Sequence, residues 1–358
     1  MQPTNLKGSN CSALYVPAIL YGILSAAALL PCTGSKGQGM AKQPDSTYVE
    51  KLPQFLSVKW SQSTDNNAIG VHSPAQVISL RPNASSVSRI HLNYDFIGVS
   101  FKFRLGFLPG NNDEDIKGKT KGFGLDFAIN RTHWLHELSY SRLKGYYLYN
   151  MSDFFPDWEK GDPFQQFPQL TLTRYQGLSS YKFNPNFSVN ALTNLTERQL
   201  KSTGTFMAHL FYQYYTSRDG SPLLPGGSRQ RSNNIEILAG GGYYHTFVVG
   251  KRGYISLGAS PLAGFVHSRI KTETGSQQLA GNQANFIARL NTKAGAGYNG
   301  SRFFAGVYFT GNLSTMKQEN TVVNTHESQV FVMAFAGYRL QAPAWLQRRV
   351  SAVKALRF

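Results

Sequence analysis

The residues in this chain that are best suited to covalent chemistry are histidines with hydroxyl or carboxylate neighbours. His267 directly precedes Ser268, and His133 and His136 lie next to Glu137 in the sequence. A serine nucleophile needs an imidazole within hydrogen-bond reach and an acid that orients the imidazole. Neighbouring residues of a strand point to opposite faces, so His267 and Ser268 cannot pair directly. We therefore predict no catalytic residue, and hydrolysis of membrane lipids ranks third among the functions considered below.

Other kinds of reactive site leave no pattern in the sequence. It contains no HExxH, GxSxG or Walker motif, and the glycine triplet 240–242 lies in a strand-like run, where glycines let bulky neighbours pack. The two cysteines, Cys11 and Cys32, both fall within the first 41 residues. We accordingly expect no metal, no cofactor and no thiol chemistry in the remainder of the chain.

Charged side chains offer a second kind of site. The chain has 36 Lys and Arg against 19 Asp and Glu, but the basic residues are scattered, so we do not expect a nucleic-acid partner. If the chain forms a β-barrel, as argued below, charges that point inward could pair across a filled lumen. In an open lumen they could instead form a net-positive ring that favours anions. Filled interiors are the rule in narrow barrels. The candidate lumen charges are Lys102, Arg104, Asp126, Glu236, Arg289, Lys293 and Arg302.

The segments that must position these charges show a period of two from Gln54 onward, which is typical of strands whose faces meet different surroundings. The glycine content, and the tyrosines near segment ends, favour a transmembrane barrel over a β-sandwich, whose strands alternate in a similar way. In the clearest segment, Val99, Phe101, Phe103, Leu105 and Phe107 share one face, whereas Ser100, Lys102, Arg104 and Gly106 share the other.

The connections between segments are of two sizes, as the two rims of a membrane barrel require. Long polar loops are predicted at 109–119, 151–169, 217–231, 271–281 and 315–327, and short turns at 130–131, 184–186, 249–252 and 299–300. This alternation of short and long breaks near 81–86 and between 194 and 204. We predict an all-β, antiparallel up-and-down transmembrane barrel of about twelve strands (roughly 10–14), with the long loops extracellular.

The two ends of the chain differ from its middle. Residues 1–41 have the layout of a secretory signal peptide that is cleaved, although a retained anchor or an acylated Cys32 would also use such a segment. Residues 42–53 are predicted to be periplasmic and 54–341 to form the barrel. Residues 342–358 after the last strand are predicted to form a basic amphipathic helix, which lies on an acidic membrane surface, in the barrel mouth, or as a partly ordered extension.

Several phrases resemble those of an uncharacterised family of outer-membrane barrels, the domain of unknown function DUF4421. The resemblance covers about residues 48–340 and implies a barrel and an export route, without a reaction or residue roles. The helical tail departs from the pattern, which would end near its last strand. The phrases are Tyr48-Val49-Glu50-Lys51, Arg81-Pro82-Asn83, Gly118-Lys119-Thr120-Lys121, Arg142-Leu143-Lys144-Gly145, Glu197-Arg198-Gln199, Lys201-Ser202-Thr203-Gly204 and Gly337-Tyr338-Arg339.

These observations predict an exported barrel of the outer membrane that acts as a small channel, porin-like or transport-associated protein. A structural or partner subunit of an envelope assembly is the alternative. The expected partners are outer-membrane lipid and the barrel-insertion machinery, and the sequence identifies no protein partner. The lumen decides between the alternatives, because side chains and the segment 43–53 could either plug it or leave a path for water.

Overall fold

A computed structural model describes residues 43–64, 68–72, 77–222, 228–274, 277–315 and 329–355. The predicted signal peptide, residues 1–41, lies outside the described residues. Residues 42–350 form one compact unit. No helix in the described ranges is both long and apolar enough to cross a membrane.

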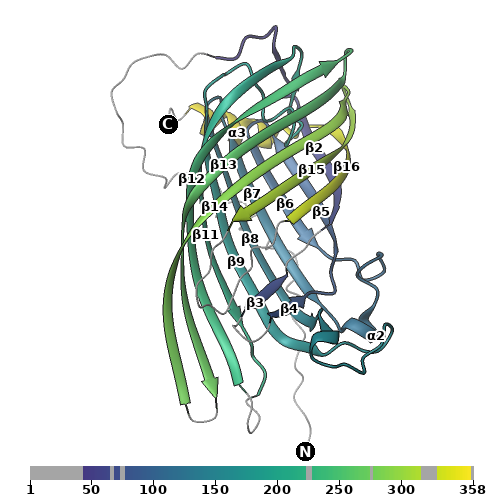
Figure 1. The fold of residues 1–358 in the computed structure, drawn as a ribbon. Helices are drawn as coiled ribbons and strands as arrows, with labels where there is room; N and C mark the ends of the chain where they lie inside the picture. The colour runs from purple at the N-terminus through teal and green to yellow at the C-terminus, as the bar shows by residue number, and fades with distance from the viewer. Residues whose placement is uncertain are drawn as a thin grey trace, which may run out of the picture. The chain divides into compact units, whose positions relative to one another are not determined.

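Twelve of the described strands close into one antiparallel barrel (Figure 1). Consecutive strands pair around the wall, and the last strand pairs with the first, Tyr338 lying opposite Val58. The predicted all-β architecture and strand number are thus confirmed. The wall consists of β2 (Phe55–Thr64), β5 (Ser86–Tyr94), β6 (Ile97–Phe103), β7 (Lys121–Asn130), β8 (Trp134–Leu148), β9 (Gln166–Lys182), β11 (Thr203–Arg218), β12 (Ser228–Val249), β13 (Gly253–Thr274), β14 (Gln277–Asn299), β15 (Phe303–Thr315) and β16 (Gln329–Gln341).

Alternation sends large apolar side chains outward and small or polar ones inward. On β2, Trp60 is 43% exposed while Ser57 and Ser61 are fully buried. On β6, Phe101 is exposed and Ser100 is buried. The same holds around the wall, and an exposed apolar outer face with a polar interior is the pattern of barrels that contact lipid. The outward apolar residues include Phe123, Phe206, Leu210, Ile237, Phe265, Phe286, Val307 and Phe309.

The strands differ greatly in length. β5 and β6 have 9 and 7 residues, whereas β12, β13 and β14 have 22, 22 and 23. Figure 1 shows β12, β13 and β14 extending well past their shorter neighbours. A tilted strand needs only roughly 9–11 residues to cross a bilayer. The long strands therefore exceed the length that would cross a bilayer, and the excess lies on the side of the long loops.

Both breaks in the loop alternation have a structural cause. The connection from β2 to β5 contains a hairpin of β3 (Ile69–His72) and β4 (Val77–Arg81), which pairs with the end of β8. The connection from β9 to β11 is not the short turn predicted at 184–186. It runs from 183 to 202 and carries β10 (Glu197–Gln199), which pairs with β1 (Val49–Lys51).

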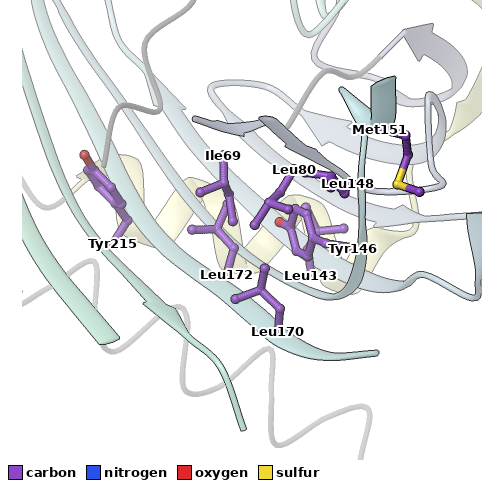
Figure 2. Packing of buried hydrophobic residues seen from close by; sticks show 9 residues of the cluster. All are labelled: Ile69, Leu80, Leu143, Tyr146, Leu148, Met151, Leu170, Leu172 and Tyr215. Atoms are coloured by element: carbon purple, nitrogen blue, oxygen red, sulfur yellow. The ribbon is translucent and has the colours of Figure 1, made fainter. Parts of the chain in front are cut away.

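Apolar side chains of the β3–β4 hairpin pack inside the long-loop end of the barrel (Figure 2). They contact inward residues of β8, β9 and β11, and the cluster comprises Ile69, Leu80, Leu143, Tyr146, Leu148, Met151, Leu170, Leu172 and Tyr215. Two short helices lie in the other long connections at this end: α2 (Glu114–Lys117) between β6 and β7, and the 3-10 turn η1 (Met151–Asp153) between β8 and β9.

The strand predicted to run to Phe107 ends earlier, because β6 stops at Phe103 and the chain turns, with Leu108 donating its N–H to the Leu105 carbonyl (3.2 Å). The predicted helical tail is present as α3 (Ala344–Ala355). Its first turn begins after Pro343, whose carbonyl accepts from the Leu346 N–H at 3.0 Å.

Candidate functional site

The connection between β9 and β11, residues 183–202, folds into the barrel and is called the plug segment here. Its apolar side chains are buried against the inner wall. Leu195 is fully buried with Phe304 and Phe335, and Phe187 is 1% exposed beside Tyr254. Because these partners belong to β13, β15 and β16, the plug segment reaches well across the bore at the end where the short turns lie.

Arg339 of β16 is the main polar anchor of the plug segment. Its side chain is completely buried. The guanidinium donates to the Leu195 carbonyl at 2.9 Å, to Asn299 Oδ1 at 2.5 Å and to the Gly300 carbonyl. The planar guanidinium thus holds the plug segment and the β14–β15 turn together through several donors in a fixed geometry.

Further anchors come from around the circumference. Lys59 Nζ of β2 donates to the Thr193 carbonyl at 2.7 Å, and Tyr308 Oη of β15 donates to the Leu192 carbonyl at 2.8 Å. Additional bonds join Asn190 Nδ2 to the Asn130 carbonyl, Thr196 Oγ1 to the Asp95 carbonyl, and Asn299 Nδ2 to the Ala191 and Glu197 carbonyls. Donors and acceptors from opposite parts of the wall therefore fix the plug segment across the opening.

The segment 43–53, predicted as a possible plug, instead adds to the plug segment. β1 pairs in antiparallel register with β10, and Glu50 forms an ion pair with Arg198 at 2.9 Å. The Leu52 N–H donates to the Thr196 carbonyl at 3.1 Å. Sequence reasoning missed the plug segment itself, although the broken loop alternation between 194 and 204 was a signal that pointed to it.

Beyond the plug segment, the barrel encloses a cavity of about 460 Å³. The cations on its wall outnumber the carboxylates, of which Glu137 and Glu236 are the two that line it. Five of the predicted lumen charges lie here, namely Lys102, Arg104, Glu236, Arg289 and Lys293. The cationic lining residues are Arg89, Lys102, Arg104, Arg174, Arg289 and Lys293.

Two ion pairs brace this cavity. Lys102 Nζ lies 2.5 Å from Asp126 Oδ1, and Ser139 bonds to both side chains. Arg289 Nη2 lies 2.5 Å from Oε1 of the fully buried Glu236. These pairs join neighbouring parts of the wall, as a structural role for lumen charges requires.

Arg302 is not a lumen residue. It lies in the turn before β15, where its guanidinium stacks over the Phe55 ring at 4.5 Å and donates to the Arg339 carbonyl at 3.3 Å. The parity argument failed because side-chain alternation applies within a strand, and Arg302 precedes the strand by one residue.

Comparison with protein-family models identifies the family of this chain. The model described as "Domain of unknown function (DUF4421)" matches residues 43–340. The chain belongs to the DUF4421 family. No curated protein matches it.

Solved structures resemble this DUF4421 chain only weakly. The attachment invasion locus protein Ail of Yersinia pestis is 11% identical, with 81% of this chain and 99% of Ail covered and a TM-score of 0.19. OmpT of Vibrio cholerae is 9% identical, with coverage of 82% and 97% and a TM-score of 0.16. The yersiniabactin receptor FyuA of Y. pestis is 11% identical at a TM-score of 0.24; coverage is 83% of this chain and 45% of the receptor. Overlaps at this level carry no information about role.

His136 and His267, which were considered for hydrolysis from the sequence of this DUF4421 chain, do not meet the serine and acid considered with them. His136 Nδ1 lies 3.0 Å from Ser179 Oγ on the outer wall, which is a cross-strand hydrogen bond. Glu137 points the other way and lines the cavity, so it cannot orient that imidazole. His267 faces outward while Ser268 is buried. The described residues also contain no cluster of His, Cys, Asp and Glu that could hold a metal ion.

Proposed function

We propose that this chain is an outer-membrane barrel that takes up small anionic solutes into its lumen, with passage controlled by the plug segment. It acts in this proposal as a binding and transport protein rather than as an enzyme. The observation that carries the proposal is a cation-rich cavity whose wall residue Tyr308 also holds the plug segment, through its bond to the Leu192 carbonyl.

The charge balance supports an anionic solute. Six cations line the cavity against Glu137 and Glu236, and Asp126 on the inner face of β7 pairs with Lys102. Counting all three carboxylates, the surplus is 6 − 3 = +3. A lumen whose low-dielectric walls carry one sign of charge concentrates ions of the opposite sign.

The construction of the plug segment supports a gate. It contains little regular structure, since β10 has three residues, and its hydrogen bonds to the wall come largely from side chains. Segments with few ladder hydrogen bonds open locally at lower free energy than the strands around them. The plug segment can therefore move while the hydrogen-bonded wall of the barrel stays intact.

Conductance in planar bilayers tests this proposal. The wild-type chain without residues 1–41 is expected to insert and to conduct rarely. Arg339→Gln removes the central anchor and is expected to raise the open time, with a reversal potential that shows anion preference. Lys251→Gln, which removes an exposed cation from the β12–β13 turn at the same rim, is the matched control and is expected to behave as wild type.

Three results would contradict the proposal. Failure of the folded barrel to insert would remove its membrane part. If the Arg339→Gln protein inserted but gave no conductance, the claim that the plug segment controls passage would be wrong. A preference for cations in the open state would remove the anionic solute.

A further inference from the structure

The outer wall of the long-strand side carries a line of basic residues in one cross-strand register. Lys121 of β7 lies opposite Lys144 of β8, which lies opposite Thr171 of β9. Thr171 lies opposite Arg218 of β11, Arg218 opposite Arg231 of β12, and Arg231 opposite Lys271 of β13. Alternation places all six on the outward face. This set, Lys121, Lys144, Thr171, Arg218, Arg231 and Lys271, is called the basic row.

The next row towards the short turns, two residues along each strand, is also polar except for Phe123 on β7. It contains Arg142 opposite Thr173, and Asn233 opposite Arg269. Neither of these two rows contains a carboxylate across β7 to β13. The ion pair of Arg229 with Glu273, at 2.5 Å, lies one row further out.

Four residues along each strand from the basic row, towards the short turns, the outward residues become mainly aromatic. Beyond them they become apolar. Tyr140, Tyr175 and Tyr214 lie side by side, with ring centroids 5.1 and 6.3 Å apart. The row beyond them is apolar on every strand except for glycine on β9, and comprises Phe127, Leu138, Gly177, Tyr212, Ile237 and Phe265. Tyrosine rings of this kind occupy the interface between lipid tails and water.

The sequence of rows matches the depth profile of a bilayer leaflet. Apolar residues face the acyl chains, tyrosines the interface, and the basic row the headgroup level. Long Lys and Arg side chains also reach back towards that level from slightly beyond it. Strands of membrane barrels tilt by about 35–45°, so directly paired residues on successive strands lie at successive depths. Within the basic row, the neighbouring Arg218, Arg231 and Lys271 are close enough in depth to share the headgroup level on the side of the long loops.

The basic row is unfavourable for the isolated protein. Residues directly opposite on adjacent strands have Cβ atoms about 4.5–5.5 Å apart, and like charges there repel. Three such pairs occur, Lys121 with Lys144, Arg218 with Arg231, and Arg231 with Lys271. An anion bound between them would relieve the repulsion, and phosphate accepts bidentate hydrogen bonds from arginine.

We infer that the basic row binds the phosphate groups of membrane lipids in the leaflet on the long-loop side. The inference rests on the membrane location in the proposed function, but not on the lumen or the plug segment. Lipid is the occupant because the basic row is continuous with the tyrosines and the apolar wall, and complementary in charge to the headgroups. An acidic protein would need no such continuity.

Binding of a diphosphorylated lipid A to the purified chain without residues 1–41 tests the inference, by native mass spectrometry and by the rise in Tm on adding the lipid. The variant is Arg218→Gln, Arg231→Gln and Lys271→Gln together. The control is Lys251→Gln, Arg252→Gln and Arg302→Gln, which removes the same charge from exposed residues at the opposite rim. A matching lipid A without phosphates is the second probe.

Wild type and control are expected to bind the phosphorylated lipid alike. Each Lys or Arg near an anionic surface contributes roughly a factor of five, so the basic-row variant should bind at least about tenfold more weakly. Without lipid that variant should be at least as heat-stable as wild type, because the repulsion is gone. The lipid lacking phosphates should not distinguish the three proteins.

The outcomes separate this inference from the proposed function. Equal binding by wild type and the basic-row variant overturns the inference while leaving the barrel in the membrane. Equal loss in the variant and the control shows a net-charge effect and overturns it as well. Protein that folds but does not enter bilayers overturns both.

Discussion

The two ends of the lumen use the same residue types in different ways. At the plug segment, the cations Lys59, Lys182 and Arg339 donate to backbone carbonyls at 193, 187 and 195. In the cavity, Lys102 and Arg289 pair with carboxylates instead. A cation that donates to backbone carbonyls holds a segment of chain in place. Cations that outnumber the carboxylates around a cavity instead attract an anionic solute. The partner, and not the residue type, decides the role.

Breaking the cavity pair between Arg289 and Glu236 should have the largest effect on stability. Arg289→Met leaves a fully buried carboxylate without its guanidinium. Removing one member of a buried pair costs about 3–5 kcal/mol, which should appear in urea unfolding in lipid vesicles. Lys293→Gln, four positions along the same strand and exposed, should cost less than about 0.5 kcal/mol. Equal costs would contradict the distinction between bracing and surplus charges.

Loss of the plug anchor should have a smaller and local effect. Arg339→Gln leaves the Leu195 and Gly300 carbonyls with fewer donors. Local opening of the plug segment lets water reach these carbonyls, so the free energy of unfolding of the whole barrel should fall by only about 1–3 kcal/mol. Hydrogen exchange should quicken at residues 187–199 and stay slow in β12 and β13. If exchange quickened throughout the barrel, the plug segment would be part of the wall's stability and not a separate element.

The smallest of the three effects is expected from a single hydroxyl. Tyr308→Phe removes the bond to the Leu192 carbonyl and the 2.9 Å bond to Tyr254, and leaves the packing against Phe335 in place. Only the bond to the Leu192 carbonyl holds the plug segment, and one hydrogen bond contributes about 1 kcal/mol, so exchange at residues 190–194 should rise about fivefold. Val307→Ala, which faces outward from the neighbouring position, should leave that exchange unchanged.

The barrel could be predicted from the sequence because alternation is local. A period of two set the inward faces of Lys102, Asp126, Glu236 and Arg289 before any register was known. Their partners could not be predicted in the same way. Glu236 and Arg289 lie on β12 and β14, with β13 between them, so their contact depends on the register of two pairings and on side-chain length.

The plug segment escaped prediction for a different reason. Residues 183–202 show no regular alternation of apolar and polar residues, and their many polar side chains are typical of a surface loop. Their burial depends on Arg339, Lys59 and Tyr308, which are distant in sequence and carry no mark that sets them apart from other inward polar residues. The basic row was missed because its members come from six strands, and it exists only once those strands are in register.

The long-range anchors of the plug segment also set an order of assembly. The bonds from Lys59 to Thr193 and from Arg339 to Leu195 span 134 and 144 residues. Contacts of such high sequence separation form late, because the chain between them must first be ordered. The anchors on β14, β15 and β16 are made from the last part of the chain. Closure of the wall also waits for β16, which pairs with β2 across a still longer stretch of chain. The plug segment is therefore locked, and the lumen sealed, only when the last strands are in place.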